Sequence, residues 1–482
     1  MTGVPFTPSM LLAVLPEILL IVLGGVAIAT DLALPADRKR NVGLVTATGF
    51  GLIILVALFV SVPTGAGELI FGGMVRHDML AFVFRLLFLF AGAITALIAL
   101  DSPGLEKSGE FHVLLAAAVL GMNLMAAAAD LIMLYLALEL TSIVLYVLAG
   151  FLRTNDKSAE SGLKYFLFGA FTSTIMLYGF SLLYGFTGET SLYKLAEALT
   201  STPSAAILMT LIMVMVGFGF KVSAFPLHFW SPDVYEGSPS PVTGFLSTAS
   251  KSAGFAVLLR VLLAVFPEAQ AYTAPFIAAI AVFTMTVGNT IALAQKNIKR
   301  LLAYSSIAQA GYVLVGLAAF SERGISSILY YLGTYTLTNL AAFGVIVLVS
   351  RAVGSDEIAD YAGLSRRSPG LALVLLIAFL SLGGMPPLAG FFGKFFVFAA
   401  AVEQGLVWLV VIAVINAIVG LYYYLTVLKV IYLFRSERDN EPVPVSRAYA
   451  VALWICSVGI ILLGTWIGPW VNLSNLAAGS LF

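Results

Sequence analysis

Long, uninterrupted runs of apolar residues dominate the chain, and short polar stretches separate them. A helix needs about 20 mostly apolar residues to cross about 30 Å of hydrocarbon, and fourteen runs are long enough. They are predicted at 9–30, 41–62, 78–100, 111–129, 131–152, 160–186, 205–228, 242–266, 272–295, 298–320, 325–351, 369–402, 405–434 and 447–474. The runs do not alternate in polarity as the strands of a membrane barrel do. The pattern therefore predicts an all-α membrane protein with about 14 transmembrane helices.

The composition supports this class and excludes several functions. Hydrophobic residues make up 60% of the 482 residues and charged residues 10%, whereas soluble proteins carry about 45–50% apolar and about 25% charged residues. The single cysteine, Cys456, cannot by itself hold an iron–sulfur cluster or a zinc ion. The longest polar intervals, such as 187–204, are too short for a nucleotide or flavin domain. We therefore expect no cofactor and no metal in this chain, and the zero net charge gives no reason to expect nucleic acid.

Basic residues are distributed unevenly between the predicted loops. Odd-numbered loops hold 15 of the 25 lysines and arginines, whereas even-numbered loops hold only Arg76, Lys194 and Arg323. Because lysine and arginine accumulate in cytoplasmic loops, the odd-numbered loops are expected on the cytoplasmic side. An even number of spans then places both termini on the periplasmic face.

Two predicted spans contain glycines and prolines where an ordinary membrane helix would continue. The chain reads GFGFKVSAFPLHFWSPDVYEGSPSPVTG over 217–244 and LSLGGMPPLAGFFGKFFVF over 380–398. Proline removes a backbone donor, and at membrane depth this is tolerated only where protein or water satisfies the freed groups. A packing kink is the simpler explanation, but each break lies beside a lysine, Lys221 or Lys394. Discontinuous helices of this kind form ion sites in transporters.

The two halves of the chain are weakly similar. Tyr146 aligns with Tyr312, and GFGFK at 217–221 aligns with GFFGK at 390–394. The repeat unit is about five helices, and an odd number of helices forces the second copy to insert upside down. The predicted parts are an N-terminal three-helix segment (1–110), a first inverted repeat of spans 4–8 (111–266), a second of spans 9–13 (267–434) and a C-terminal helix (435–482).

Ionisable residues inside the predicted spans are candidate functional residues. Such a charge costs about 2.5–3.5 kcal/mol at a helix centre, so it needs a partner, water or a function. Two acids, Glu17 and Glu139, lie inside spans. The basic residues inside spans are Arg85, Lys164, Lys221, Lys251, Arg260, Lys394 and Lys429. Three of them lie near the ends of their spans, namely Arg85, Lys164 and Lys429. There a long side chain can extend to the membrane surface.

The deep lysines Lys221, Lys251 and Lys394 are suited to proton transfer, because a desolvated lysine can be charged or neutral near working pH. We expect protons to pass along them through intervening water, with Glu139 at one end. His228, seven residues after Lys221, could lie on the same helical face and serve as a link, although an interfacial position is the simpler interpretation. Lys164 follows Glu139 on the next span. Their depths differ by about 10 Å at 1.5 Å per residue, so a water bridge is expected rather than a direct ion pair.

The segments that carry these residues resemble the antiporter-like, proton-translocating subunits of respiratory complex I, a family related to the Mrp antiporters. The likeness extends over essentially all fourteen spans and is most specific in the FPLHFWSPDVYEGSP stretch. It rests on LALELTSIVLYVLAGF (136–151), SGLKYFLFGAFTS (161–173), FKVSAFPLHFWSPDVYEGSPSPVTGFLSTASKSAGF (220–255), NIKRLLAYSSIAQAGY (297–312) and GGMPPLAGFFGKFFVF (383–398). Within that family the chain is most similar to the bacterial subunit N branch. We do not expect the long lateral helix of the L branch, and the chain has a lysine at Lys394 where the M branch is expected to carry glutamate.

This resemblance implies a role for each matching residue. Glu139 and Lys164 would be the coupling pair, Lys221 the central relay lysine, Lys251 the connecting lysine and Lys394 the exit-channel residue. It implies a subunit of NADH:quinone oxidoreductase in the bacterial inner membrane that couples distant electron transfer to proton pumping. FMN, iron–sulfur clusters and quinone would belong to partner subunits, namely the peripheral redox arm and the other membrane-arm subunits.

Three other functions fit parts of the sequence. A subunit of an Mrp-type Na⁺/H⁺ antiporter, or the membrane subunit of an energy-converting hydrogenase, would share the fold and most relay positions. A non-pumping scaffold is also conceivable, but a scaffold gains nothing from three costly buried lysines. The first two alternatives stay open at this point.

Overall fold

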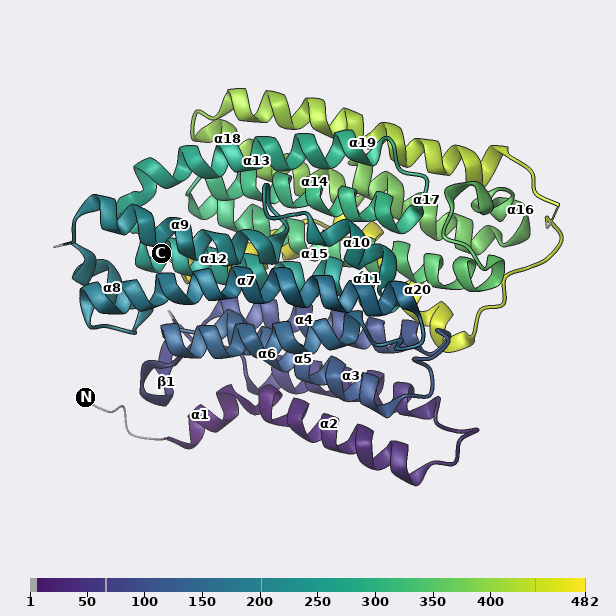
Figure 1. The fold of residues 1–482 in the computed structure, drawn as a ribbon, viewed down its shortest axis with the longest axis horizontal. Coiled ribbons are helices and arrows are strands. Elements are labelled where there is room, and N and C mark those ends of the chain that lie inside the picture. Colours follow the sequence, from purple (N-terminus) through teal and green to yellow (C-terminus); the bar gives the residue numbers. More distant parts are fainter. Residues whose placement is uncertain (1–6, 66, 201, 438, 482) are drawn as a thin grey trace.

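The computed structural model describes residues 7–65, 67–200, 202–437 and 439–481. Its helices run roughly along one common axis and form a single bundle (Figure 1). The helices of the first half are α1 (Pro8–Ala13), α2 (Leu15–Ala33), α3 (Asn41–Val60), α4 (Met79–Ala99), α5 (Gly109–Ala127), α6 (Leu131–Ala149), α7 (Asp156–Thr187), α8 (Leu192–Leu199), α9 (Ser204–Val222), α10 (Trp230–Gly237) and α11 (Ser240–Phe245). Those of the second half are α12 (Lys251–Val265), α13 (Gln270–Ala292), α14 (Ile298–Ala318), α15 (Glu322–Val353), α16 (Leu364–Arg367), α17 (Pro369–Gly383), α18 (Ala389–Glu403), α19 (Val407–Leu433), α20 (Arg447–Thr465) and α21 (Gly468–Gly479). The short strands β1 (Glu68–Ile70) and β2 (Val75–His77) pair as an antiparallel hairpin.

The number of membrane crossings agrees with the prediction. Within the described residues, thirteen helical segments are long and apolar enough to cross a membrane. The apolar helix α17 is too short to do so alone, and it continues into α18 after a break, which makes the fourteenth crossing. The chain is a multi-pass, all-α membrane protein, as the hydropathy pattern predicts.

The two predicted breaks are present. Helix α9 ends at Val222, the next residue, Ser223, is in the left-handed conformation (φ 59°), and α10 begins only after a turn of several residues. Helix α17 ends in the same way at Gly384 (φ 84°) before α18 starts. Both breaks fall in the fourth span of their predicted repeat, while the division into repeats stays a prediction. A third break was not predicted: the last span is divided into α20 and α21 just before Pro469.

A further irregularity precedes α12. Leu246–Ser250 form a π-helical turn, and Lys251 is the first residue of regular α-helix after it. The apolar run 242–266 predicted an ordinary helix there. Single π-helical turns inside α-helices are rare and occur frequently at functional sites.

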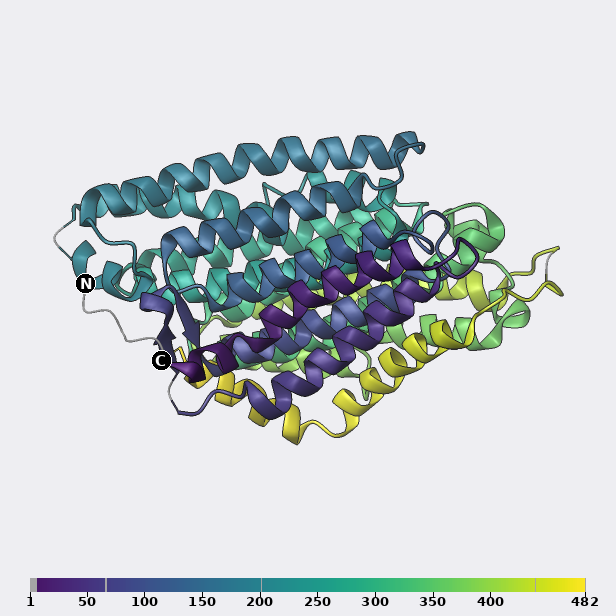
Figure 2. The ribbon, with the colours of Figure 1, turned by 90° about the horizontal axis from the view of Figure 1, so that it is seen from below.

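The contacts between loops agree with the predicted number of crossings, while the side of the membrane that each end faces stays a prediction. At one end Asp101 accepts bonds from Arg40 Nη2 (2.6 Å) and Ser446 Oγ (2.7 Å), which joins the predicted loops 1, 3 and 13. At the other end Arg76 Nη2 donates to the carbonyl of Ser480 (3.0 Å). Figures 1 and 2 show α1 and β1 at this second end, opposite α16.

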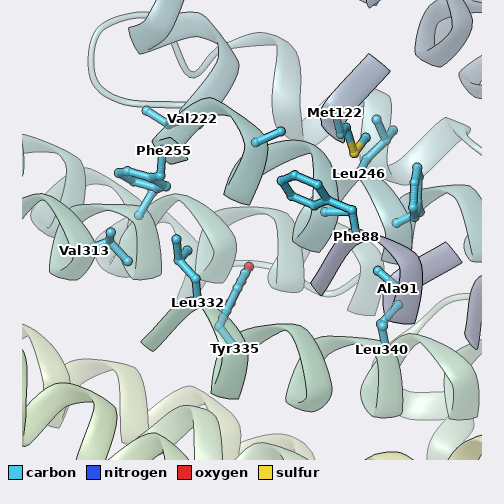
Figure 3. Packing of buried hydrophobic residues seen from close by; sticks show 14 of the residues in the cluster. Phe88, Ala91, Met122, Val222, Leu246, Phe255, Val313, Leu332, Tyr335 and Leu340 are labelled. Atoms are coloured by element: carbon cyan, nitrogen blue, oxygen red, sulfur yellow. The ribbon is translucent and has the colours of Figure 1, made fainter. Parts of the chain in front are cut away.

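The interior of the bundle is formed by α12, α14 and α15, which are buried over almost their whole length. Figure 3 shows Phe88 of α4, Leu246 of the π-turn, Phe255 of α12 and Leu340 of α15 in this common core. Because outer helices shield these three from lipid, polar groups on them can bond to one another without facing hydrocarbon.

Candidate functional site

Three buried lysines form the centre of the candidate site. Lys221 lies one residue before the end of α9, Lys251 follows the π-turn at the start of α12, and Lys394 lies in α18 just after the second break. Each is at most 6% exposed. All three therefore lie where the backbone departs from a continuous α-helix, and their predicted burial is confirmed.

The first two lysines bind neutral oxygen atoms on neighbouring helices. Lys221 Nζ donates to Ser142 Oγ in α6 at 3.0 Å. Lys251 Nζ donates to the carbonyl of Ser306 in α14 at 2.9 Å and to its hydroxyl at 2.5 Å. Hydroxyl and carbonyl dipoles can accept from an ammonium group, but they do not neutralise its charge.

The second break supplies the acceptor for the third lysine. Because α17 stops at Gly384, the carbonyl of Leu382 has no partner in a following helical turn. Lys394 Nζ donates to this carbonyl at 2.7 Å, and Gln309 Nε2 of α14 donates to it at 3.2 Å. The ring of Tyr312 lies 4.9 Å from the Lys394 ammonium, within cation–π distance.

The two buried arginines differ from the lysines in having acidic partners. Arg85 Nε lies 2.8 Å from Glu17 Oε1, and Arg260 makes two bonds to the Asp78 carboxylate, at 2.8 and 3.0 Å. Among the described residues, none of the three buried lysines has a carboxylate within ion-pair distance. A buried charge without a counterion is easily lost by deprotonation. The arginines are therefore structural, whereas the lysines are suited to exchange protons.

A polar face of α14 fills the space between the second and third lysines. Ser306 binds one of them, and Gln309, one turn later, shares a carbonyl acceptor with the other. Ser305 and Gln309 both bond to the hydroxyl of Tyr424 in α19, the latter at 3.2 Å. Sequence reasoning missed these residues, although the polar run SSIAQ inside an apolar span was a usable signal.

Lys164 lies outside this buried row. Its side chain is 36% exposed, and its Nζ pairs with Asp233 Oδ2 (2.6 Å) and Glu160 Oε1 (2.8 Å). Within the described chain no ion pair joins it to Glu139. Lys164 therefore lies near the end of the bundle, within the polar first turns of α7, as its position near a span end suggested, and its role in the relay stays a prediction.

Glu139 lies in α6 one turn before Ser142, the serine that accepts a hydrogen bond from Lys221 Nζ. Glu139 Oε1 is buried and has no hydrogen-bond partner among the described atoms. The coupling of Glu139 to Lys164 stays a prediction.

His228 does not share a helical face with Lys221. Helix α9 ends at Val222, and His228 lies in the following turn, stacked on Phe225 and Phe229 with ring centroids 5.7 and 4.5 Å apart. Its Nδ1 is buried without a hydrogen-bond partner in the described structure. The spacing argument was wrong because it assumed that the helix continues through the break, and the role of His228 as a link stays a prediction.

An ion network at the end of the bundle holds α10 between α7 and α14. Arg300 Nη1 donates to Asp233 (2.8 Å) and Glu236 (3.0 Å), and Lys157 Nζ donates to Glu236 (2.9 Å). Burial alone would raise the pKa of the Asp233 carboxyl, but its hydrogen bonds from Lys164 and Arg300 outweigh burial and hold that pKa below its usual range. The network fixes the segment that follows the first break.

We expect Asp233→Asn to loosen α10. Exposed ion pairs contribute about 0.2–1 kcal/mol each, so amide exchange in Trp230–Gly237 should increase several-fold at neutral pH. In the wild type the pKa of the Asp233 carboxyl in the folded protein lies below its ordinary value of 3.8. The stabilisation that its ion pairs give α10 is therefore complete above pH 3.8. It is lost as the pH falls through the lower pKa of Asp233 in the folded protein. Hydrogen exchange followed by mass spectrometry, corrected for the intrinsic effect of pH, measures both effects. Equal exchange in Asp233→Asn and in the exposed control Asp37→Asn would contradict this assignment.

Comparison with known proteins gives consistent similarities. The sequence model of the transmembrane NADH:quinone oxidoreductase/Mrp antiporter family matches residues 128–420, which include every residue of the buried row. A NADH-quinone oxidoreductase subunit N of Moorella thermoacetica is 41% identical over 470 residues, 97% of this chain and 98% of the relative. A chain of Thermus thermophilus respiratory complex I is 35% identical with a TM-score of 0.78, covering 95% of this chain and 98% of its own. A chain of the Mrp complex of Dietzia sp. has a TM-score of 0.88, covering 99% and 98%, but at 20% identity it shows the fold alone.

Proposed function

Because the chain belongs to the NADH:quinone oxidoreductase/Mrp antiporter family of membrane proteins, we propose that it is a proton-translocating membrane-arm subunit of an NADH:quinone oxidoreductase. NADH oxidation and quinone reduction take place in partner subunits, which hold FMN and iron–sulfur clusters. This chain lies in the bacterial inner membrane with its odd-numbered loops on the cytoplasmic side. The observation that carries the proposal is the row of three buried lysines without acidic partners.

The proposed proton path begins at Glu139 and Lys221. A charged Glu139 favours the protonated lysine, and any event that neutralises Glu139 favours release of its proton. The stem of Lys221 lies along α12, where a Cβ at Gly254 would come within 3.1 Å of its Cγ. Gly254 therefore leaves space for the side chain of Lys221 against α12, one helical turn after Lys251.

From Lys251 the proposed path follows the polar face of α14. Hydroxyl groups can accept one proton and donate another, so Ser306 and Tyr424 with intervening water form a continuous route. Repulsion between neighbouring ammonium groups favours having only one of two adjacent lysines charged. A proton that enters at one end therefore promotes release at Lys394. This alternation is how a charge change at Glu139 would move a proton through the membrane-embedded core.

Lys221→Ala tests the proposed function. We expect the variant to assemble, while protons moved per NADH oxidised fall several-fold and coupled quinone reduction also falls. Dye quenching in inverted membrane vesicles measures pumping, and NADH absorbance measures electron transfer. Lys429→Ala is the matched control, because Lys429 is an exposed lysine on α19 that lies over the ring of Phe434. Wild-type pumping by assembled Lys221→Ala complex would contradict the relay assignment.

The partners are tested by gentle purification from native membranes. Co-purification of a flavin- and iron–sulfur-containing assembly that oxidises NADH supports the proposed function. A purely membrane-embedded complex without redox centres would favour a Na⁺/H⁺ antiporter subunit instead, and co-purifying nickel would favour a hydrogenase.

A further inference from the structure

A buried network of amide and phenol groups lies beside Lys394 and is not part of the proposed path. Asn289 of α13 occupies its centre and is 1% exposed. Asn289 Nδ2 donates to Tyr312 Oη at 3.1 Å and to Asn416 Oδ1 at 3.2 Å, and Asn289 Oδ1 accepts from Tyr423 Oη at 3.1 Å. One side chain thus joins three helices, α13, α14 and α19.

The network ends on the aromatic ring that faces the third buried lysine. The Tyr312 ring contacts the Lys394 ammonium at 4.9 Å, and its hydroxyl points to Asn289. An aromatic face attracts a cation most strongly where water is excluded. The strength of this attraction depends on ring position, and Asn289 holds the far end of the ring.

An asparagine at this site needs an explanation. Burying an amide is unfavourable unless its hydrogen bonds are made, and a leucine would fill a similar volume between outer helices at no such cost. Here both amide hydrogens and the carbonyl oxygen are bonded. Such a complete set of bonds fixes one orientation of each partner.

We propose that Asn289 is a positioning residue for proton transfer at Lys394. It anchors the Tyr312 ring beneath the ammonium group and so sets how readily Lys394 takes up and releases a proton. The inference rests on the proposed function, because it assumes that Lys394 carries the pumped proton.

The other groups around Lys394 do not supply a competing charge. Its amine binds the neutral carbonyl of Leu382. The titratable side chains buried on the helices that pack against α18 are one lysine, several neutral phenols and one thiol: Lys299 and Tyr312 on α14, Tyr330, Tyr331 and Tyr335 on α15, Tyr423 and Tyr424 on α19, and Tyr449 and Cys456 on α20. Lys299 lies in the first turn of α14, more than three turns from Tyr312, and pairs with Asp356 at 3.2 Å. The carboxylate of α18 itself, Glu403, lies at its far end and pairs with Arg323. The ring and the carbonyl are therefore the main interactions that stabilise a charged Lys394.

The test compares the pH profile of proton pumping between assembled complexes. Asn289→Leu should lower protons moved per NADH and shift the profile to lower pH by about 0.5 unit, the size expected for a weakened cation–π contact. Tyr312→Phe should shift it in the same direction, because it keeps the ring but removes the anchored hydroxyl. Asn289→Gln keeps both amide functions and should restore most of the wild-type profile. The control is Asn123→Leu, which removes a buried asparagine of α5.

The outcomes separate this inference from the proposed function. A wild-type profile in Asn289→Leu, alongside lost pumping in Lys394→Ala, would overturn the role of Asn289 but not the relay. Normal pumping in Lys394→Ala would overturn the proposed role of the lysine itself. An equal shift in Asn123→Leu would show a general packing effect and would also overturn the inference. If Asn289→Leu does not assemble, Tyr312→Phe decides: a shifted profile supports the proposal and an unshifted one overturns it.

Discussion

Lys251→Ala is expected to lower the rate of NADH-driven proton pumping at least tenfold while the complex still assembles. Lys251 lies between the other two buried lysines, and its ammonium bonds only to the backbone and hydroxyl of Ser306. Proton transfer by a positioned side chain contributes about 10²–10⁴-fold to a rate. Removing the middle carrier therefore leaves a step that neither neighbour can bridge.

A second variant separates the charge of Lys251 from its ability to exchange a proton. Lys251→Arg keeps a cation at the site, but arginine does not lose its proton in proteins. We expect Lys251→Arg to pump as poorly as Lys251→Ala. Pumping is measured in vesicles with NADH as substrate, and assembly is measured by co-purification of the redox subunits. Full pumping by Lys251→Arg would show that the residue supplies a fixed charge rather than a proton.

Arg260→Leu is expected to have the largest effect on stability. Arg260 is 1% exposed and bonds to both oxygens of the Asp78 carboxylate, to the carbonyl of Ala126 and to the hydroxyl of Tyr193. Removing one partner of a buried ion pair costs about 3–5 kcal/mol when the other charge stays buried. Here Asp78 keeps Arg76 at 3.2 Å, but it loses both bonds from Arg260, and the Ala126 carbonyl loses its donor. We therefore expect little assembled complex and a markedly lower unfolding temperature in detergent.

The matched control for this variant is an exposed ion pair. Arg323→Ala removes the partner of Glu403, with 62% of the arginine side chain exposed, and such pairs contribute about 0–1 kcal/mol. Thermal unfolding followed by tryptophan fluorescence compares the two variants. Similar unfolding temperatures would contradict the structural role assigned to Arg260.

The predictions for Lys251 and for Arg260 distinguish two uses of buried charge in one chain. The arginines bind carboxylates that lie far away in the sequence and hold α4 against α2 and α12. The lysines bind only neutral oxygen atoms, and each lies at a break or a π-turn. A relay group must be able to lose its charge, whereas a structural group must keep it.

Much of the architecture could be read from the chain alone. The fourteen crossings follow from the length of apolar residues needed to span hydrocarbon. The breaks after Lys221 and before Lys394 follow from prolines, which remove a backbone donor, together with nearby glycines, which weaken a helix. The buried lysines could be recognised because a charge in an apolar span is costly without a function.

Only the tertiary structure decided which groups meet. Lys221 binds Ser142 of α6, His228 is displaced by the end of α9, and α14 contributes Ser306 to Lys251 and Gln309 to the carbonyl that binds Lys394. Hydropathy reports how deep a residue lies, but it does not report how each helix is rotated about its axis. That rotation is set by packing between segments more than a hundred residues apart, such as α14 and α19, and it determines which side chains come within bonding distance.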